Sequence, residues 1–241
     1  MTNFVYINGY KTFYKQKGKG KNLLLLHGWG GNKDCFGPFF DNMSNHFCVT
    51  ALDFWGFGQS DFPPEQADTF WYAKMTREFV SALGIEGCNI VAHSFGGRVA
   101  IILSREKGLF GNVVLCSSAG MKPKFNLKRY IKTKKYKRAK KRGKNTKRYG
   151  SNDYKNLPVQ MQGVFVRVVN DFLESCAKNT VANVLLVWGK KDKTTPLYMA
   201  KKLNRLIKNS GLVVINDGGH FCFLDDFYTF SLVVESFFGV L

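Results

Sequence analysis

The chain alternates short apolar runs with longer amphipathic stretches along most of its length. Six runs are apolar at consecutive positions and end in glycine or polar residues: KNLLLLHGWGGN, CVTALDFWGFGQSD, CNIVAHS, GNVVLCSSAG, VANVLLVWGKKD and GLVVINDGGH. Continuous apolar runs of this length are typical of strands that are buried on both faces of a parallel sheet. Before them, FVYINGYKTFYKQKG alternates apolar and polar positions around Asn8-Gly9, which predicts a β-hairpin.

The segments between these runs have the spacing of amphipathic helices. Apolar positions recur three and four residues apart, which predicts helices at residues 69–83, 95–107, 196–209 and 224–239. Strands that alternate with helices favour an α/β fold, in which a mostly parallel, doubly wound sheet is covered by helices on both faces.

One interval interrupts this alternation. Residues 121–175 contain no buried-strand pattern, and LPVQMQGVFVRVVNDFLE at the end of the interval has helical spacing. In open α/β sheets the functional groups gather beyond the carboxyl ends of the strands. We therefore expect residues 1–120 and 176–241 to form the core, with residues 121–175 as a helical, Lys-rich cap over the strand ends.

The positive charge of the chain belongs to this interval. The formal net charge is +19, and residues 122–148 hold 15 of the 36 basic residues and no acid, which leaves 21 basic residues to balance 17 acidic ones elsewhere. Such a run can attract nucleic acid, anionic lipid or an acidic substrate, and Tyr130, Tyr136 and Tyr149 in or beside it suit stacking on bases. We favour a solvated cap surface with no specific nucleic-acid partner, and weak contact with an anionic surface is the alternative.

Length and composition exclude several classes of protein. The chain has 241 residues, 45% of them hydrophobic, which suits one large globular domain. No apolar run reaches 18 residues and the N-terminal segment lacks a signal-like apolar stretch, so we expect no transmembrane segment and a cytoplasmic location. The six cysteines form no CxxC pair and no metal-like spacing, and we expect buried free thiols.

Ser94 stands between a predicted strand and a predicted helix, in the stretch AHSFGG. A serine at such a sharp turn is a nucleophile elbow, in which the residues two before and two after it must be small. Ala92 and Gly96 meet this demand, although the usual pattern has glycine at the first place. The alternative role is an N-cap for the helix, which is common for serine at this type of junction.

A serine hydroxyl is a poor nucleophile near neutral pH and needs an adjacent base. Of the four histidines, His27 and His93 lie in motif loops, where we expect the backbone to matter more than the ring, and His46 follows a helical stretch. His220 ends the last strand within NDGGHFCFLDD, so it reaches the same sheet edge as Ser94. We therefore expect His220 to be the base.

The imidazole in turn needs an acid that holds its tautomer. In enzymes whose serine sits at an elbow, the acid lies between serine and histidine in the chain. Six residues meet this condition: Glu106, Asp153, Asp171, Glu174, Asp192 and Asp217. Asp192 follows directly after the strand VANVLLVWG and emerges at the correct edge, so we expect it to be the acid, with Asp217 as its main competitor.

Acyl transfer also requires donors for the developing oxyanion. The N–H of Phe95 follows the serine and is the first candidate. The second is the N–H of Trp29, because the glycines of HGWGG allow the backbone to curl inward. An ordinary glycine-rich turn after the strand is the alternative.

Five segments in this order resemble the α/β-hydrolase family. LLLLHGWGG is similar to its oxyanion loop, LDFWGFGQSD to its D-x-x-G-x-G-x-S segment, AHSFGG to its elbow, WGKKDKTTP to its acid loop and GGHFCFLD to its histidine loop. The resemblance implies a sheet of about eight strands, a cap inserted after the sixth strand and a metal-free Ser94-His220-Asp192 triad. Dehalogenases and epoxide hydrolases of this family use aspartate at the elbow, so Ser94 argues against both.

These features predict a serine hydrolase that cleaves a small or medium acyl ester through an acyl-enzyme, without metal or cofactor. Its partner would be a small-molecule acyl substrate, and we expect four aromatic residues to line the pocket: Phe54, Trp55, Phe57 and Phe221. Two alternatives stay open. One is a carbon–carbon bond hydrolase that acts on a vinylogous diketone, and the other is a binding protein that kept the fold without turnover.

Overall fold

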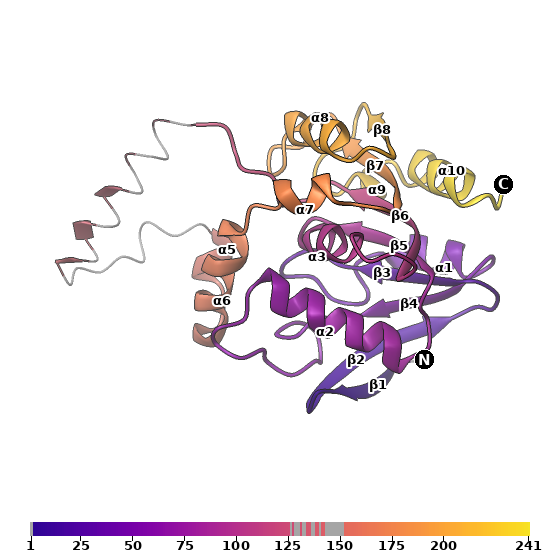
Figure 1. The fold of residues 1–241 in the computed structure, drawn as a ribbon, viewed down its shortest axis with the longest axis horizontal. Coiled ribbons are helices and arrows are strands. Elements are labelled where there is room, and N and C mark those ends of the chain that lie inside the picture. Colours follow the sequence, from indigo (N-terminus) through magenta and orange to yellow (C-terminus); the bar gives the residue numbers. More distant parts are fainter. Residues whose placement is uncertain are drawn as a thin grey trace.

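A computed structural model describes residues 2–125 and 152–241, together with residues 127, 131, 134, 135, 138, 139, 141 and 142. The described residues form one sheet of eight strands, with helices packed on it (Figure 1). The strands are β1 (Thr2–Ile7), β2 (Tyr10–Lys17), β3 (Asn22–Leu26), β4 (Cys48–Leu52), β5 (Cys88–His93), β6 (Phe110–Cys116), β7 (Asn183–Gly189) and β8 (Ser210–Ile215).

The order of the strands in the sheet is β1-β2-β4-β3-β5-β6-β7-β8. The strands from β4 to β8 in this order run parallel, whereas β1 and β2 are antiparallel to their neighbours. This confirms the predicted α/β fold with a mostly parallel sheet. The hairpin turns at Asn8 and Gly9, whose φ angles of 48° and 86° are both positive, as a tight turn between twisted strands requires.

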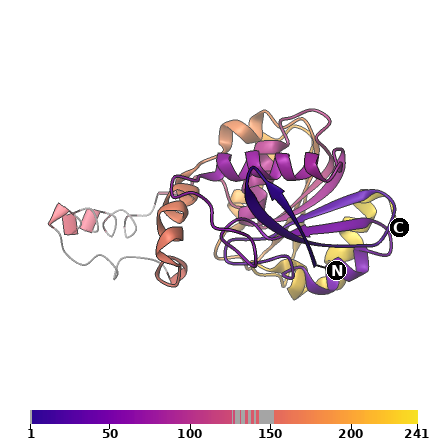
Figure 2. The same ribbon diagram turned by 90° about the horizontal axis from the view of Figure 1, so that it is seen from below.

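Helices cover both faces of the sheet (Figures 1 and 2). One face packs against α2 (Thr69–Ala82), α3 (Phe95–Leu103) and α8 (Leu197–Leu206), and the other against α1 (Gly37–Met43) and α10 (Phe227–Phe238). Strand β3 shows why its sequence is continuously apolar. Leu24 and Leu26 enter one core and Leu23 and Leu25 the other, and all four are fully buried.

The apolar pattern overestimated the length of three of the predicted helices, and α8 ends at Leu206 instead of residue 209. The helix expected at 224–239 is divided into α9 (Cys222–Asp225) and α10, because the carboxylate of Asp226 accepts a hydrogen bond from the N–H of Thr229 and caps α10. Helix α3 ends at Leu103 and does not reach residue 107. The hydroxyl of Ser104, just beyond this end, bonds back to the carbonyl of Ala100.

The interval after β6 contributes three described helices: α5 (Asn152–Lys155), α6 (Val159–Asn170) and α7 (Glu174–Lys178). Hydrogen bonds tie it to the rest of the molecule. For example, the Asp171 carboxylate accepts from the N–H of Thr69, and the N–H of Leu173 donates to the carbonyl of Gly120. Most of the basic run, with Tyr130, Tyr136 and Tyr149, lies outside the described residues. The division of the chain into a core and a cap therefore stays a prediction.

All six cysteines are free thiols, and four of them are buried: Cys88, Cys116, Cys176 and Cys222. This agrees with the expectation from their spacing. Within the described ranges, every helix is too short or too polar to span a lipid bilayer.

Candidate active site

Ser94 occupies the turn from β5 into α3, and its backbone is strained there. Its φ and ψ are 49° and −104°, a region that few residues other than glycine adopt. The residues after Ser94 pack closely against neighbouring segments. A Cβ at Gly96 would collide with the carbonyl oxygen of Leu26, and a Cβ at Gly97 would collide with the Ser118 side chain. The crowding at Gly96 explains why this turn needs a small residue two places after the serine.

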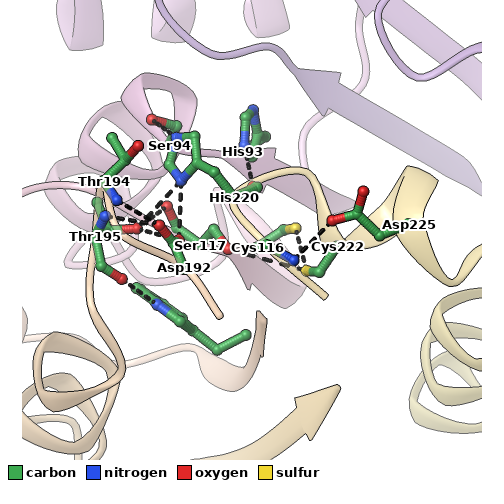
Figure 3. Close-up of polar contacts among 12 residues, drawn as sticks. His93, Ser94, Cys116, Ser117, Asp192, Thr194, Thr195, His220, Cys222 and Asp225 are labelled. Atoms are coloured by element: carbon green, nitrogen blue, oxygen red, sulfur yellow. Dashed lines mark hydrogen bonds and ion pairs between the residues drawn. The ribbon is translucent and has the colours of Figure 1, made fainter. Parts of the chain in front are cut away.

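A line of two hydrogen bonds connects Ser94 to Asp192 through His220 (Figure 3). The Nε2 atom of His220 lies 3.0 Å from the Ser94 hydroxyl oxygen, and its Nδ1 atom lies 2.9 Å from Oδ2 of Asp192. The three side chains follow β5, β7 and β8, whose carboxyl ends meet at one edge of the sheet. His220 is therefore adjacent to both partners, although it is 28 residues from Asp192 and 126 residues from Ser94 in the chain.

Asp192 is held as a carboxylate by its surroundings. Its side chain is fully buried, its Oδ1 accepts hydrogen bonds from the N–H groups of Thr194 and Thr195, and its Oδ2 accepts one from the Thr195 hydroxyl at 2.7 Å. Burial alone raises the pKa of Asp192, but hydrogen bonds from His220 and Thr195 outweigh it, so the net change in pKa is downward. An ionised carboxylate beside Nδ1 favours the tautomer that leaves Nε2 free to accept a proton.

Asp217, the competing acid, lies elsewhere. Its side chain is 88% exposed and forms an ion pair with Lys191 at 2.6 Å, and it makes no hydrogen bond with His220. The pair with Lys191 lowers the pKa of Asp217.

Two further histidine rings support the loops of this site, which the sequence patterns did not indicate. The Nε2–H of His93 donates to the carbonyl oxygen of His220 at 2.9 Å, and the ring centroids of the two residues are 4.8 Å apart. His27 donates from Nδ1 to the carbonyl of Gly28 and accepts from the N–H of Phe54 at Nε2. The sequence patterns led us to expect that the backbone of these two residues matters more than the ring, because their side-chain contacts depend on loops that meet only in the fold.

Burial keeps both of these rings neutral. Loss of solvation lowers the pKa of His27 to about 4 and that of His93 to about 3. For His93, the nearby His220 lowers the pKa further. A neutral His27 with both nitrogens engaged fixes the geometry of the loop that begins at Gly28.

The backbone N–H groups of Trp29 and Phe95 have no hydrogen-bond acceptor among the described residues. Phe95 is the first residue of α3, where the N–H groups have no partner within the helix. The Trp29 loop is tightly curled, since the N–H of Gly31 bonds to the carbonyl of Gly28 and Gly30 has a φ of 79°. A Cβ at Gly28 would lie only 3.3 Å from the Cβ of Ser94, so this loop passes directly beside the serine.

Ser94 and His220 open into a cavity of about 860 Å³. Its far wall is largely apolar and comes from α6 and the following turn, with Phe165, Val168 and Phe172. This size suits a small-molecule ligand. Within the described part of the chain, no three histidine, cysteine, aspartate or glutamate side chains gather as a metal-binding group.

The predicted pocket aromatics divide between the cavity and the core. Phe221 is 49% exposed and lines the cavity, as expected. Phe54, Trp55 and Phe57 do not line it, so that prediction was wrong. They are buried because the loop after β4 folds under α2, where the Tyr72 hydroxyl bonds to the carbonyl of Trp55 and the Tyr72 ring packs against Phe54.

Comparisons with known proteins agree with this architecture. A family model described as alpha/beta hydrolase fold matches residues 21–133 and 121–227. An uncharacterized protein of Mycobacterium tuberculosis is 27% identical over 270 residues, which cover 96% of this chain and 79% of that protein.

Two solved structures share the architecture over almost the whole chain. An esterase from Exiguobacterium antarcticum has a TM-score of 0.79 at 18% identity, with coverage of 98% of this chain and 99% of the esterase. A meta-cleavage product hydrolase from Pseudomonas fluorescens IP01 has a TM-score of 0.78 at 20% identity, with coverage of 98% and 97%. At these identities the two structures show a common fold and nothing about substrate.

Proposed function

The chain belongs to the α/β-hydrolase family, and we propose that within it the protein is a serine hydrolase that cleaves small or medium acyl esters through an acyl-enzyme. The observation that carries this proposal is the hydrogen-bonded line from Ser94 Oγ through the His220 ring to Asp192, with distances of 3.0 Å and 2.9 Å. A nucleophile, a base and an orienting acid in direct contact match the requirements of acyl transfer.

In the first half of the reaction, Ser94 Oγ attacks the ester carbonyl carbon while His220 Nε2 takes the hydroxyl proton. Asp192 stabilises the imidazolium that results, and it stays ionised. The N–H groups of Trp29 and Phe95 bind the oxyanion, since neither has an acceptor among the described residues. Trp29 lies in the loop that passes beside Ser94, and Phe95 follows Ser94 as the first residue of α3. His220 then gives its proton to the alcohol that leaves, and the acyl group stays on Ser94.

In the second half, His220 removes a proton from a water molecule, which attacks the acyl-enzyme carbonyl. The tetrahedral intermediate collapses, the Ser94 oxygen takes the proton back from His220 and the free acid departs. No step needs a cofactor or a metal ion. We place this activity in the cytoplasm, as the six free cysteines suit a reducing compartment.

A covalent probe tests the proposal. A fluorophosphonate is expected to label the wild-type protein and the Ser81→Ala variant, which changes an exposed serine on α2, but not the Ser94→Ala variant. A wild type that is folded and unreactive would refute catalysis by Ser94 and favour a binding protein with a hydrolase fold.

A substrate panel then separates ester hydrolysis from carbon–carbon bond hydrolysis, because both reactions can use a serine, a histidine and an oxyanion site. Chromogenic esters of increasing acyl length are assayed beside a vinylogous diketone. Turnover of the esters with no turnover of the diketone is expected. The opposite result would replace the ester with a carbon–carbon bond as the target.

A further inference from the structure

The cavity above Ser94 is positively charged. Its described lining contains three cationic side chains, Arg98, Lys124 and Lys193, and no aspartate or glutamate. The two lysines are exposed, whereas Arg98 is only 7% exposed. Solvent therefore screens the charges of Lys124 and Lys193. The charge of Arg98 lies deeper in the wall, where screening by solvent is weaker.

Arg98 stands one helical turn after Ser94 on α3. Its Nη1 donates a hydrogen bond to the main-chain carbonyl of Asp171, which is a neutral acceptor. Among the described residues no carboxylate lies within 4.0 Å of its guanidinium. Burial lowers the pKa of Arg98, and the charges of Asp171 and Glu174 partly offset this without a direct ion pair. The hydrogen bonds of these two carboxylates go to the N–H of Thr69 and to Lys202.

A buried cation without a counter-ion is costly, and it usually has a partner of opposite charge. Arginine presents five N–H donors in a planar fork that fits a carboxylate, and Arg98 uses one of them on Asp171. Burial lowers the pKa of Arg98 to about 10, so the side chain keeps its charge at neutral pH. The remaining donors belong to a side chain that lines the cavity beside Ser94.

We propose that Arg98 is a specificity-determining residue that binds a carboxylate on the substrate, so that the enzyme prefers anionic esters to neutral ones. This proposal rests on the serine-hydrolase function proposed above. The structural alternative is that Arg98 only fastens α3 to the turn after α6 through Asp171. A purely structural role would affect neutral and anionic substrates equally, whereas a binding role would change the ratio between them.

The test compares two pairs of esters of similar length. In the first pair the charge is on the acyl side: the mono-4-nitrophenyl ester of adipate against 4-nitrophenyl heptanoate. In the second pair it is on the alcohol side: the hexanoyl ester of 4-hydroxybenzoate against phenyl hexanoate. We expect the wild type to favour the anionic member of one pair by about tenfold or more in kcat/KM, and the pair that responds shows which side carries the carboxylate.

The Arg98→Met variant is expected to lower this anionic-to-neutral ratio at least tenfold, mainly through KM. Arg98→Lys keeps the charge but loses the fork, and we expect it to lower the ratio by a smaller factor. If the methionine variant fails to fold, the lysine variant carries the test. Arg105→Met is the matched control, because Arg105 is exposed, bonds to the carbonyl of Ile102 and does not line the cavity. It should leave the ratio unchanged.

A binding measurement separates failure of this inference from failure of the proposed function. Calorimetry with free adipate needs no turnover, and we expect binding to wild type and to Ser94→Ala, with at least tenfold weaker binding to Arg98→Met. If adipate binds with this dependence on Arg98 but the fluorophosphonate does not label the protein, the proposed hydrolase function fails and the anion site is retained. Equal loss on both members of each pair, or a wild type with neither ester preference nor adipate binding, would overturn the role of Arg98.

Discussion

The two sides of the cavity are built in different ways. The side that carries Ser94, Asp192 and His220 consists of short loops after parallel strands, fixed by glycines and main-chain hydrogen bonds. The opposite wall consists of α6 and the turn after it, and it presents apolar side chains such as Phe165 and Phe172. The proposed chemistry thus depends on backbone geometry that tolerates few residues, whereas the shape of the wall depends on side chains that can be exchanged. Changes on the first side should therefore cost more activity than changes on the second.

The largest effect is expected from Asp192→Asn. An asparagine has nearly the same shape as the aspartate, but it favours the wrong tautomer of His220. We therefore expect kcat to fall by about 10⁴-fold. The measurement is the steady-state rate on a chromogenic ester. Asp217→Asn is the matched control, since Asp217 is exposed and paired only with Lys191, and it should retain the wild-type rate. A similar loss in both variants would remove the distinction between the two acids.

The second expected effect is a loss of stability in acid, which comes from the buried rings of His27 and His93. The pKa values of His27 and His93 in the folded protein, about 4 and about 3, lie below the value of about 6.5 for a free imidazole. As the pH falls, these two histidines therefore bind protons at a higher pH in the unfolded chain than in the folded protein. The contribution of these two rings to the free energy of unfolding is fully present above about pH 6.5. It is lost as the pH falls from about 6.5 toward the pKa of each ring in the folded protein, by up to about 1.4 kcal/mol per pH unit for each ring.

Urea unfolding at pH 7 and pH 5 measures this loss. We expect a lower midpoint at pH 5, and a smaller difference between the two conditions in a His27→Gln variant. Ring proton signals of His27 and His93 in NMR spectra should not titrate above pH 5. Signals that titrate near pH 6.5 would show that these rings are not held neutral by burial.

A smaller effect is expected from Thr195→Val, which removes the hydroxyl that donates to Asp192 at 2.7 Å without much change in shape. A hydrogen bond to a charged group contributes about 1.5–3 kcal/mol, so we expect kcat to fall by about 10- to 100-fold. Thr195→Ser keeps the hydroxyl and should recover most of the rate. If serine is as slow as valine, a retained hydroxyl does not preserve the rate, and the hydrogen bond from Thr195 to Asp192 is not what the rate depends on.

The smallest effect is expected on the opposite wall. Phe165→Ala removes a ring that lines the cavity and packs 5.2 Å from the Trp29 ring, and we expect the preferred acyl length to shift with a change in kcat/KM of about three- to tenfold. Val166→Ala changes the next, outward-facing position and serves as the control. A loss of fluorophosphonate labelling in Phe165→Ala would mean that the wall also supports the chemistry, and the comparison would then fail.

Sequence patterns predicted the strands well because each buried strand needs apolar residues on both faces, and β3 shows this with Leu23 to Leu26. They also selected Ser94, Asp192 and His220, which the structure brings into contact, while the catalytic roles of these residues stay a proposal. They failed for Phe54, Trp55 and Phe57, because an aromatic residue in a glycine-rich loop has the same pattern whether it turns toward the cavity or toward the core.

The sequence by itself therefore determined the order of the elements, the parallel sheet and the sharp turn at Ser94, since each follows from local spacing and from residue size. Only the tertiary structure decided that His93 bonds to the carbonyl of His220, that Asp217 stays in solvent and that Arg98 lines the cavity without a carboxylate partner in the described part of the chain. These features join residues as far apart as 127 positions. Contacts at that separation are set by how helices and loops pack on the sheet, and no local pattern in the sequence records them.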